Sequence, residues 1–146
     1  MVVARAPLAE GVENLVTTRG LALLQREESD LRMELELLRA SSDQERRVAE
    51  LEAALDELLD RLRRAVLVDP ALNDKSVVRF GDRVTVQVVG GSAPFDVTIV
   101  GVDEADPDEG LVSFGAPIAV ALLGHSVGDR VPPNAGGREV EILAIR

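Results

Sequence analysis

The chain of 146 residues has no cysteine, tryptophan or tyrosine, and its aromatic side chains are three phenylalanines. The absence of cysteine excludes disulfides, thiol nucleophiles and cysteine-ligated metals. So few rings argue against a ligand pocket built from stacked aromatic side chains. The one histidine, His125, follows an expected helix end, where a polar loop residue is ordinary. These absences favour a protein without a cofactor.

Basic residues are also scarce, with 16 Lys and Arg against 26 Asp and Glu, a net charge of −10. The charge is evenly spread, because residues 1–69 and residues 70–146 each carry −5. Binding to phosphates needs clustered Lys and Arg, so we expect no direct nucleic-acid specificity. No apolar run reaches 18 residues and the N-terminal run is too short for a signal peptide. We therefore expect a cytoplasmic protein with no membrane partner.

The composition changes sharply at Asp69-Pro70. Before this point leucine, arginine, glutamate and alanine predominate, all of which favour helix. After it valine, isoleucine, glycine and proline predominate, and Pro70 disfavours helix in the residue before it. The sequence thus predicts an α+β protein with an α-helical unit in residues 1–69 and a β-rich unit in residues 70–146.

Apolar residues of the first unit recur at alternating steps of three and four, the pattern of a coiled-coil seam. When two such seams are paired in opposite directions, the position numbers of facing residues sum to 86. This predicts an antiparallel hairpin with its turn at about residues 41–45. The one polar position is Glu28, for which an ion pair with Arg61 or Arg63 and a register-setting role are both open. The seams are Leu21, Leu24, Glu28, Leu31, Leu35 and Leu38, and Val48, Leu51, Leu55, Leu58, Leu62 and Ala65.

The turn carries the signature of a helix start. Ser42 and Glu45 have the spacing of a capping box, and Asp43 lies where the helix dipole favours a negative charge. We expect the second helix to run from about Asp43 to about Val66. Arms of some 25 residues would give a finger of roughly 35–40 Å.

The first helix is expected to begin well before its seam. Leu8, Val12 and Leu15 have helical spacing, and their phase slips by one residue across residues 16–20. Those residues are mostly poor helix formers, so we expect a kink there. The apolar face of Leu8 to Leu15 would pack against the second unit or a second chain.

The second unit reads as short strands around one helix. Alternating apolar residues predict strands over 84–88 and 95–99, and further strands over 111–113 and 140–145. A segment beginning with Pro117 and ending at residue 123 suits a short helix. The expected arrangement is an antiparallel sheet covering this helix.

An acidic run occupies residues 103–109, with five carboxylates in seven residues. It lacks the spacing of the EF-hand loop, so it is not a predicted Ca²⁺ site. We expect these side chains to lie in a solvated loop.

Several short segments carry a resemblance to a known family. In chain order they are P-L-A-E-G-V-E-N-L (7–15), V-R-F-G-D-R-V (78–84), I-V-G-V-D-E-A-D (99–106), G-L-V-S (110–113), A-P-I-A-V-A-L-L-G (116–124) and V-G-D-R-V (127–131). They resemble the P-L-T-x-E-G-x-x-x-L, V-x-F-G-x-x-V, I-V-G-x-x-E-A-D, I-S, S-P-[LM]-A-x-A-L-L-G and V-G-D segments of the Gre transcript-cleavage factors. The resemblance spans nearly the whole chain, and the independently derived hairpin agrees with it.

The resemblance implies a fold and a function. The second unit would have an FKBP-like fold and would dock on the RNA polymerase core at the rim of its secondary channel. The finger would enter the channel and place acidic tip residues beside the catalytic Mg²⁺. In cleaving members two carboxylates in a D-x-x-E tip help to hold a second metal ion that activates water. The chain itself would be a non-enzymatic partner, expected to be a monomer.

Two departures from the family pattern bear on this function. The tip consists of Ser42, Asp43, Glu45 and Arg46, so a cation stands three residues after Asp43 where cleaving members have the second acid. The chain alone is not expected to bind a metal there, although Asp43 and Glu45 could do so with the polymerase. In the docking segment of residues 115–118, Gly115 and Ala116 replace the D-S of many members, and Pro117 and Ile118 follow.

These features favour a channel-binding inhibitor of transcription that does not stimulate cleavage. A cleavage factor that uses Asp43 and Glu45 is the first alternative. A regulator of a nucleoside diphosphate kinase is the second, since one branch of the family resembles these factors and has a shorter finger. Peptidyl-prolyl isomerase activity would follow from the fold alone, and three phenylalanines are too few for its aromatic pocket.

Overall fold

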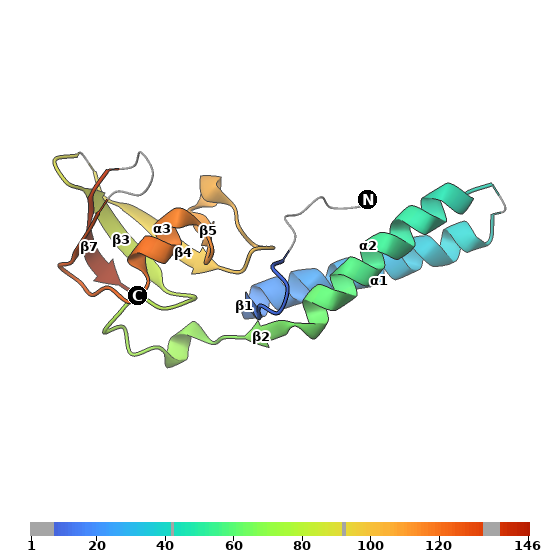
Figure 1. Cartoon of the computed structure of the whole chain (residues 1–146), viewed down its shortest axis with the longest axis horizontal. Coiled ribbons are helices and arrows are strands. Elements are labelled where there is room, and N and C mark those ends of the chain that lie inside the picture. The colour runs from blue at the N-terminus through green and yellow to red at the C-terminus, as the bar shows by residue number, and fades with distance from the viewer. Residues whose placement is uncertain (1–7, 42, 92, 133–137) are drawn as a thin grey trace.

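The molecule is elongated, with a helical hairpin at one end and a β-sheet at the other (Figure 1). The hairpin consists of α1 (Thr18–Arg39) and α2 (Glu45–Arg63).

No helix of the described part is long and apolar enough to cross a membrane. Two long helices followed by a sheet-rich part confirm the predicted α+β class. The computed structural model describes residues 8–41, 43–91, 93–132 and 138–146.

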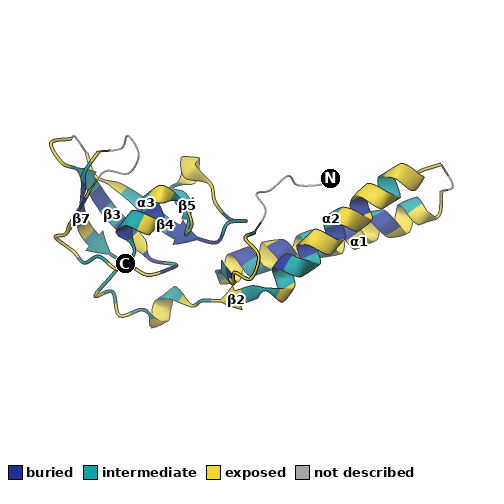
Figure 2. Ribbon diagram, in the orientation of Figure 1, coloured by how far each residue is buried: buried dark blue, intermediate teal, exposed yellow. Residues whose placement is uncertain are grey.

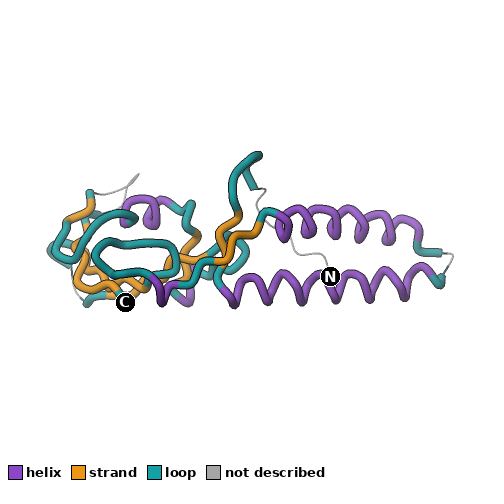
Figure 3. Tube along the Cα trace, turned by 90° about the horizontal axis from the view of Figure 1, so that it is seen from below, coloured by secondary structure: helices purple, strands orange, loops and turns teal. Residues whose placement is uncertain are grey.

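The helices pack through the predicted leucine seams. Figure 2 shows buried residues on the facing sides of α1 and α2 and exposed residues on their outer sides. In the turned view of Figure 3 the two helices again run side by side. All of the buried apolar residues except Val16 occupy seam positions, so the heptad prediction is confirmed. These residues are Val16, Leu24, Leu31, Leu35, Leu51, Leu55 and Leu58.

The polar seam position does not pair across the hairpin. Glu28 lies 3.1 Å from Arg32, one turn further along the same helix. A partner four residues away on one helix is within direct reach, which explains the local pair. Of the alternatives left open for Glu28, the ion pair with Arg61 or Arg63 is therefore not formed, and the register-setting role stays a prediction.

A short parallel pair of strands closes the base of the hairpin. Strand β1 (Asn14–Val16) pairs with β2 (Ala65–Leu67), so the chain enters and leaves the finger side by side. The predicted helix through Leu8 to Leu15 was therefore wrong, and α2 ends at Arg63 rather than at Val66. Thr17 starts α1 instead, because its hydroxyl accepts a hydrogen bond from the Gly20 amide. With 22 and 19 residues in the helices, the finger is about 30 Å long, shorter than predicted.

The second unit contains a five-stranded sheet in the order β5-β4-β3-β7-β6. Only β4 and β5 are parallel within this sheet of the described part, so the expectation of a wholly antiparallel sheet was wrong at this edge. The chain crosses from β4 to β5 through the 3₁₀ turn η2 (Pro107–Glu109). The strands are β3 (Arg83–Val88), β4 (Phe95–Val100), β5 (Leu111–Ser113), β6 (Arg130–Val131) and β7 (Val140–Ile145).

One helix, α3 (Pro117–Leu122), covers this sheet as predicted. Ala119 and Leu122 of α3 are fully buried against strand residues such as Ile99 and Ile142. The sheet and α3 therefore form one core, and the leucine-lined hairpin forms another.

The linker between the two cores is fastened to the second unit. After β2 the chain makes the 3₁₀ turn η1 (Pro70–Leu72) and then reaches the buried carboxylate of Asp82. This carboxylate accepts hydrogen bonds from the Asn73 side chain, the Lys75 ammonium and the Arg79 amide. A buried charge with three donors is well satisfied, so the linker is held in place.

Candidate functional site

The hairpin turn presents charged side chains at the far end of the finger. Asp43 and Glu45 are exposed, and the Arg46 side chain is 96% exposed. Arg46 lies 3.7 Å from Glu50, an exposed pair of the kind that adds little stability. Among the described residues no group of three or more potential ligands could hold a metal ion. The predicted tip residue Ser42 lies outside the described residues.

The start of α2 differs from the predicted capping box. Gln44 is the N-cap residue and makes no side-chain capping bond. Glu45 is therefore the first helical residue and not the third, so its carboxylate is not in the capping-box position. The acids near the tip are left exposed at the N-terminus of a helix, where the dipole favours them.

Two ion pairs link the helices just behind the tip. Arg47 of α2 lies 3.0 Å from Glu34 of α1, and Arg39 of α1 lies 2.8 Å from Glu52 of α2. Arg39 and Arg47 occupy facing positions of the two helices, because their numbers sum to 86, and the same holds for Glu34 and Glu52. The two ion pairs are therefore related by the symmetry of the hairpin. They hold the two arms in one register near the tip.

A mostly apolar groove lies between α3 and the sheet. Its volume is about 350 Å³. Pro117 and Ile118 of the predicted docking segment line it, whereas Gly115 and Ala116 lie in the preceding turn, and the Gly115 and Ala116 amides bond to Ser113. Arg138 is the charged residue among the described lining residues. The lining consists of Val88, Phe95, Pro117, Ile118, Ala121, Leu122, Val131, Pro132, Arg138 and Val140.

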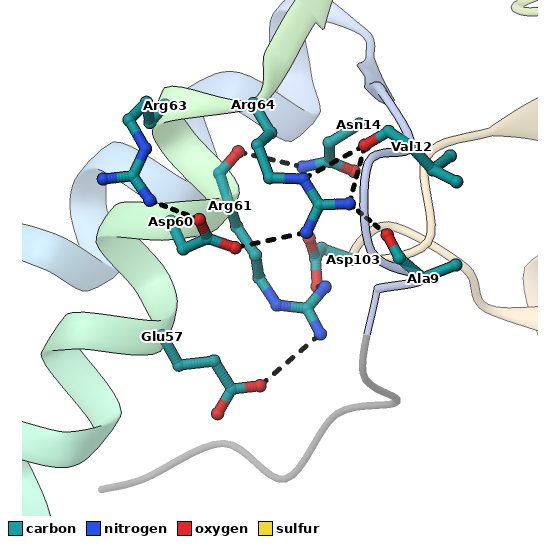
Figure 4. Close-up of polar contacts among 9 residues, drawn as sticks. All are labelled: Ala9, Val12, Asn14, Glu57, Asp60, Arg61, Arg63, Arg64 and Asp103. Carbon is teal, nitrogen blue, oxygen red and sulfur yellow. Dashed lines mark hydrogen bonds and ion pairs between the residues drawn. The ribbon is translucent and has the colours of Figure 1, made fainter.

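A polar joint connects the base of the finger to the second unit. Arg61, near the end of α2, is only 2% exposed, and its guanidinium lies 2.9 Å from the Asp103 carboxylate (Figure 4). Asp103 follows β4 and is 7% exposed at its side chain. Glu57 lies 3.6 Å from the same guanidinium, and the side-chain amide of Asn14 donates to the Arg61 carbonyl oxygen.

The first arm reaches the same turn of the second unit. The Thr17 hydroxyl donates to the Glu104 carboxylate at 2.6 Å. The other oxygen of Glu104 accepts from the Gly101 amide at 3.4 Å. Glu104 is 8% exposed, so the expectation that residues 103–109 are all solvated was wrong for Asp103 and Glu104.

A neighbouring arginine ties the N-terminal segment to α2. Arg64 donates to the carbonyl oxygens of Ala9 and Val12 and to the Asp60 carboxylate (Figure 4). The hydrogen bonds from Arg64 and then from Arg63 hold the pKa of Asp60 below its usual range. Asp60 is therefore a carboxylate at neutral pH and keeps Arg64 oriented toward the segment.

Sequence reasoning missed the joint, because its members are far apart in the chain. Arg61 and Asp103 are separated by 42 positions, and Thr17 and Glu104 by 87. Two local signals were present. Gly101 and Glu104 belong to a segment that resembles the family, and Gly20 stands near the start of a helix, where glycine is unfavourable.

Comparisons with known proteins place the chain in a family. A family model described as "Transcription elongation factor, GreA/GreB, C-term" matches residues 73–146. A transcription elongation factor GreA from Nautilia profundicola is 42% identical over 77% of this chain and 67% of its own length. A GreA from Helicobacter pylori strain Shi470 is 39% identical over 65% of this chain, and the match covers 59% of the length of that relative. A GreA from Shouchella clausii is 36% identical over 95% of this chain and 90% of its own length.

Solved structures of similar proteins superpose on this chain with low TM-scores. The GreA factor homolog 1 (Gfh1) of Thermus thermophilus has 26% identity and a TM-score of 0.43, covering 92% of this chain and 99% of its own. A GreA/GreB factor from Nitrosomonas europaea has 26% identity and a TM-score of 0.44, covering 92% and 98%. The family model spans half of this chain and the Shouchella relative nearly all of it. The chain therefore belongs to the GreA/GreB family of transcription elongation factors.

Proposed function

We propose that this protein binds bacterial RNA polymerase, inserts its finger into the secondary channel and inhibits transcription without stimulating transcript cleavage. The observation that carries the proposal is the composition of the tip. Arg46 projects into solvent three residues after Asp43, and Asp43 and Glu45 are only two apart. A guanidinium at this place opposes the binding of a second Mg²⁺, which needs oxygen ligands.

Obstruction requires shape and stiffness, and the finger has both. Its leucine core contains six fully or almost fully buried leucines, and the ion pairs between α1 and α2 support the end nearest the tip. The protein needs no catalytic group of its own for this action, and we propose that it is not an enzyme and acts as a cytoplasmic monomer.

Docking on the polymerase is proposed to use the groove beside α3. Pro117 and Ile118 reach this groove, and its wall is largely apolar. An apolar side chain of the polymerase rim could enter it, while Arg138 would attract an acidic neighbour. The docking unit would then hold the finger at the channel entrance.

The experiment is an in vitro assay with purified core polymerase. RNA synthesis should fall as the protein is added, and stalled, backtracked complexes should keep their RNA length. Unchanged synthesis at a saturating concentration would reject inhibition. Shortened RNA in the backtracked complexes would reject the non-cleaving part of the proposal.

The cleavage factor is a second candidate, because Asp43 and Glu45 are both exposed at the tip. In that case Asp43→Ala should abolish the shortening of RNA, whereas Ser41→Ala should not.

The finger of about 30 Å is shorter than predicted, and a shorter finger is the feature expected of a regulator of a nucleoside diphosphate kinase. A pull-down that recovers a kinase and no polymerase subunit would favour that function.

A further inference from the structure

Two adjacent acids of the second unit hold the two arms of the finger. Asp103 contacts Arg61 at the end of α2, and Glu104 contacts Thr17 at the start of α1. Both acids lie in the turn that follows β4, an interior strand of the sheet between β5 and β3. The finger is thus attached to the docking unit at the base of each helix, through one dipeptide.

The contact with α2 depends strongly on geometry. Arg61 and Asp103 are almost fully buried at their side chains, and burial of two charges is costly unless they are closely paired. A tilt of α2 would separate the guanidinium from the Asp103 carboxylate and break this buried ion pair, whereas Glu57 would move together with Arg61 on the same helix. Such a pair favours one relative placement of the two units over others close to it.

The contact with α1 depends on two glycines. A Cβ atom at Gly20 would lie 2.5 Å from the Glu104 side chain, and one at Gly101 would lie 2.6 Å from the Leu15 carbonyl oxygen. Each glycine therefore allows an approach that no other residue permits without movement. Because Thr17 also caps α1, the bond to Glu104 fixes the first turn of the helix itself.

We propose that the Asp103–Glu104 turn is a two-point lock that sets the direction of the finger relative to the docking unit. Asp103, Glu104, Thr17 and Arg61 are positioning residues, which act through the placement of the tip. The consequence for transcription rests on the proposed function, whereas the lock itself does not. With a lever of about 30 Å, a tilt of about 10° at the base would move the tip by about 5 Å.

The lock can be measured in the free protein, because the chain has no cysteine to interfere with labelling. Spin labels on Ser41→Cys and Val127→Cys would report the distance between the finger end and the second unit. Both positions are exposed and neither takes part in the joint. We expect one narrow distance distribution for the otherwise unchanged chain.

Asp103→Asn removes the charge that holds Arg61 and should broaden this distribution at least twofold or shift its mean. Asp108→Asn is the matched control, since Asp108 belongs to the same acidic run and is exposed. It should leave the distribution unchanged. An Asp103→Asn distribution that matches the control in width and mean would overturn the lock.

Gly20→Ala separates the lock from helix stability. Alanine favours helix more than glycine does, so loss of helix is not expected, yet its Cβ must displace Glu104. A broadened distribution with unchanged helical circular dichroism would support the lock. An unchanged distribution would count against the α1 contact.

The effect of the lock on transcription is tested with the same variants and core polymerase. Asp103→Asn should keep its affinity within about twofold, because the docking groove is untouched, and should lose most of its inhibition at saturation. Full inhibition with a broadened distance distribution would show that tip direction is unimportant and overturn the positioning role. If the unaltered protein fails to inhibit, the proposed function fails, and the distance measurement still decides the lock.

Discussion

The side chain of Arg46 is the residue on which the non-cleaving proposal depends. It stands three positions after Asp43 at the exposed tip and lies 3.7 Å from Glu50. The general chemistry of Mg²⁺ favours carboxylate oxygens at such a position. The identity of one exposed residue would then decide whether the finger only obstructs or also assists hydrolysis.

Arg46→Glu should give the protein some ability to stimulate transcript cleavage. It places a carboxylate three residues after Asp43, and we expect RNA shortening in backtracked complexes to rise at least tenfold above the level with the unaltered protein. Arg46→Gln is the control, since it removes the cation and adds no acid. Equal RNA shortening with the Glu and Gln variants would show that the spacing of the carboxylates is not the limiting feature.

Asp96 predicts a pH dependence of stability. The Thr85 hydroxyl and then the Arg83 guanidinium donate to its carboxylate and hold the pKa of Asp96 below its usual range. Its stabilising contribution is therefore complete above the unfolded-state pKa of about 3.9 and is lost as the pH falls through the lower folded-state pKa. Thermal unfolding should show a smaller decrease in Tm between pH 6 and pH 2.5 for Asp96→Asn than for the unaltered protein.

Asp108→Asn serves as the control for this measurement, because Asp108 is exposed and lies outside the strand pair. It should show the same decrease in Tm as the unaltered protein. An equally large decrease for Asp96→Asn would contradict the assignment.

At the scale of elements, the hairpin is held by its leucines more than by its ion pairs. Leu51 is fully buried between the helices, whereas Arg39 and Glu52 remain about half exposed. Exposed pairs contribute about 0–1 kcal/mol, and buried leucines contribute several times more. The ion pairs therefore refine the register of a core that apolar burial already stabilises.

Leu51→Ala should lower the free energy of unfolding by about 2–5 kcal/mol. Urea unfolding followed by helical circular dichroism measures this change. Leu37→Ala makes the same substitution at a side chain that is 71% exposed and should change the free energy by less than about 0.5 kcal/mol. Similar losses for the two variants would show that the predicted seam is not the core.

The elements that could be predicted from sequence are those with a local period. The leucine seams repeat every three or four residues, and the strands over residues 84–88 and 140–145 alternate, so their structure follows from short segments. Strands β1 and β2 pair across some fifty positions, and nothing near Asn14 signals its partner. Leu8, Val12 and Leu15 have helical spacing by chance, which explains the wrong prediction.

The residues of the candidate site also divide into those that local motifs predicted and those that only the fold brings together. The acids at the tip and the segment of Pro117 and Ile118 were predicted from the resemblance to family motifs along the chain, and their roles stay predictions. The burial of Arg61 could not be foreseen, because arginine on a helix is normally solvated and its partner Asp103 comes from the other unit. Only the folded arrangement shows that an acidic run contains two residues with a structural role.

For the whole molecule, we propose that binding to the polymerase and the effect on transcription depend on opposite ends. The groove beside α3 lies in the sheet unit, and the tip lies at the far end of the hairpin (Figure 1). A change at one end should therefore alter affinity, and a change at the other should alter the effect of the bound protein.

Ile118→Asp should weaken binding to core polymerase at least tenfold, because it places a charge in the apolar groove. Binding can be measured by the fluorescence anisotropy of a label attached at Ser41→Cys. Val120→Asp is the matched control on the same helix, since Val120 is 60% exposed and is absent from the groove lining. Equal affinities of the two variants would remove the groove from the proposed interface.

The parallel pairing of β1 with β2 has a consequence for proteolysis. Because the two ends of the hairpin are hydrogen-bonded to each other, a protease that cuts the backbone near Asp43 would not release either arm. The two fragments would stay associated through the leucine core and would migrate as one species on a native gel, separating only in denaturant. Such a nicked protein would offer a way to exchange one arm for a chemically synthesised version.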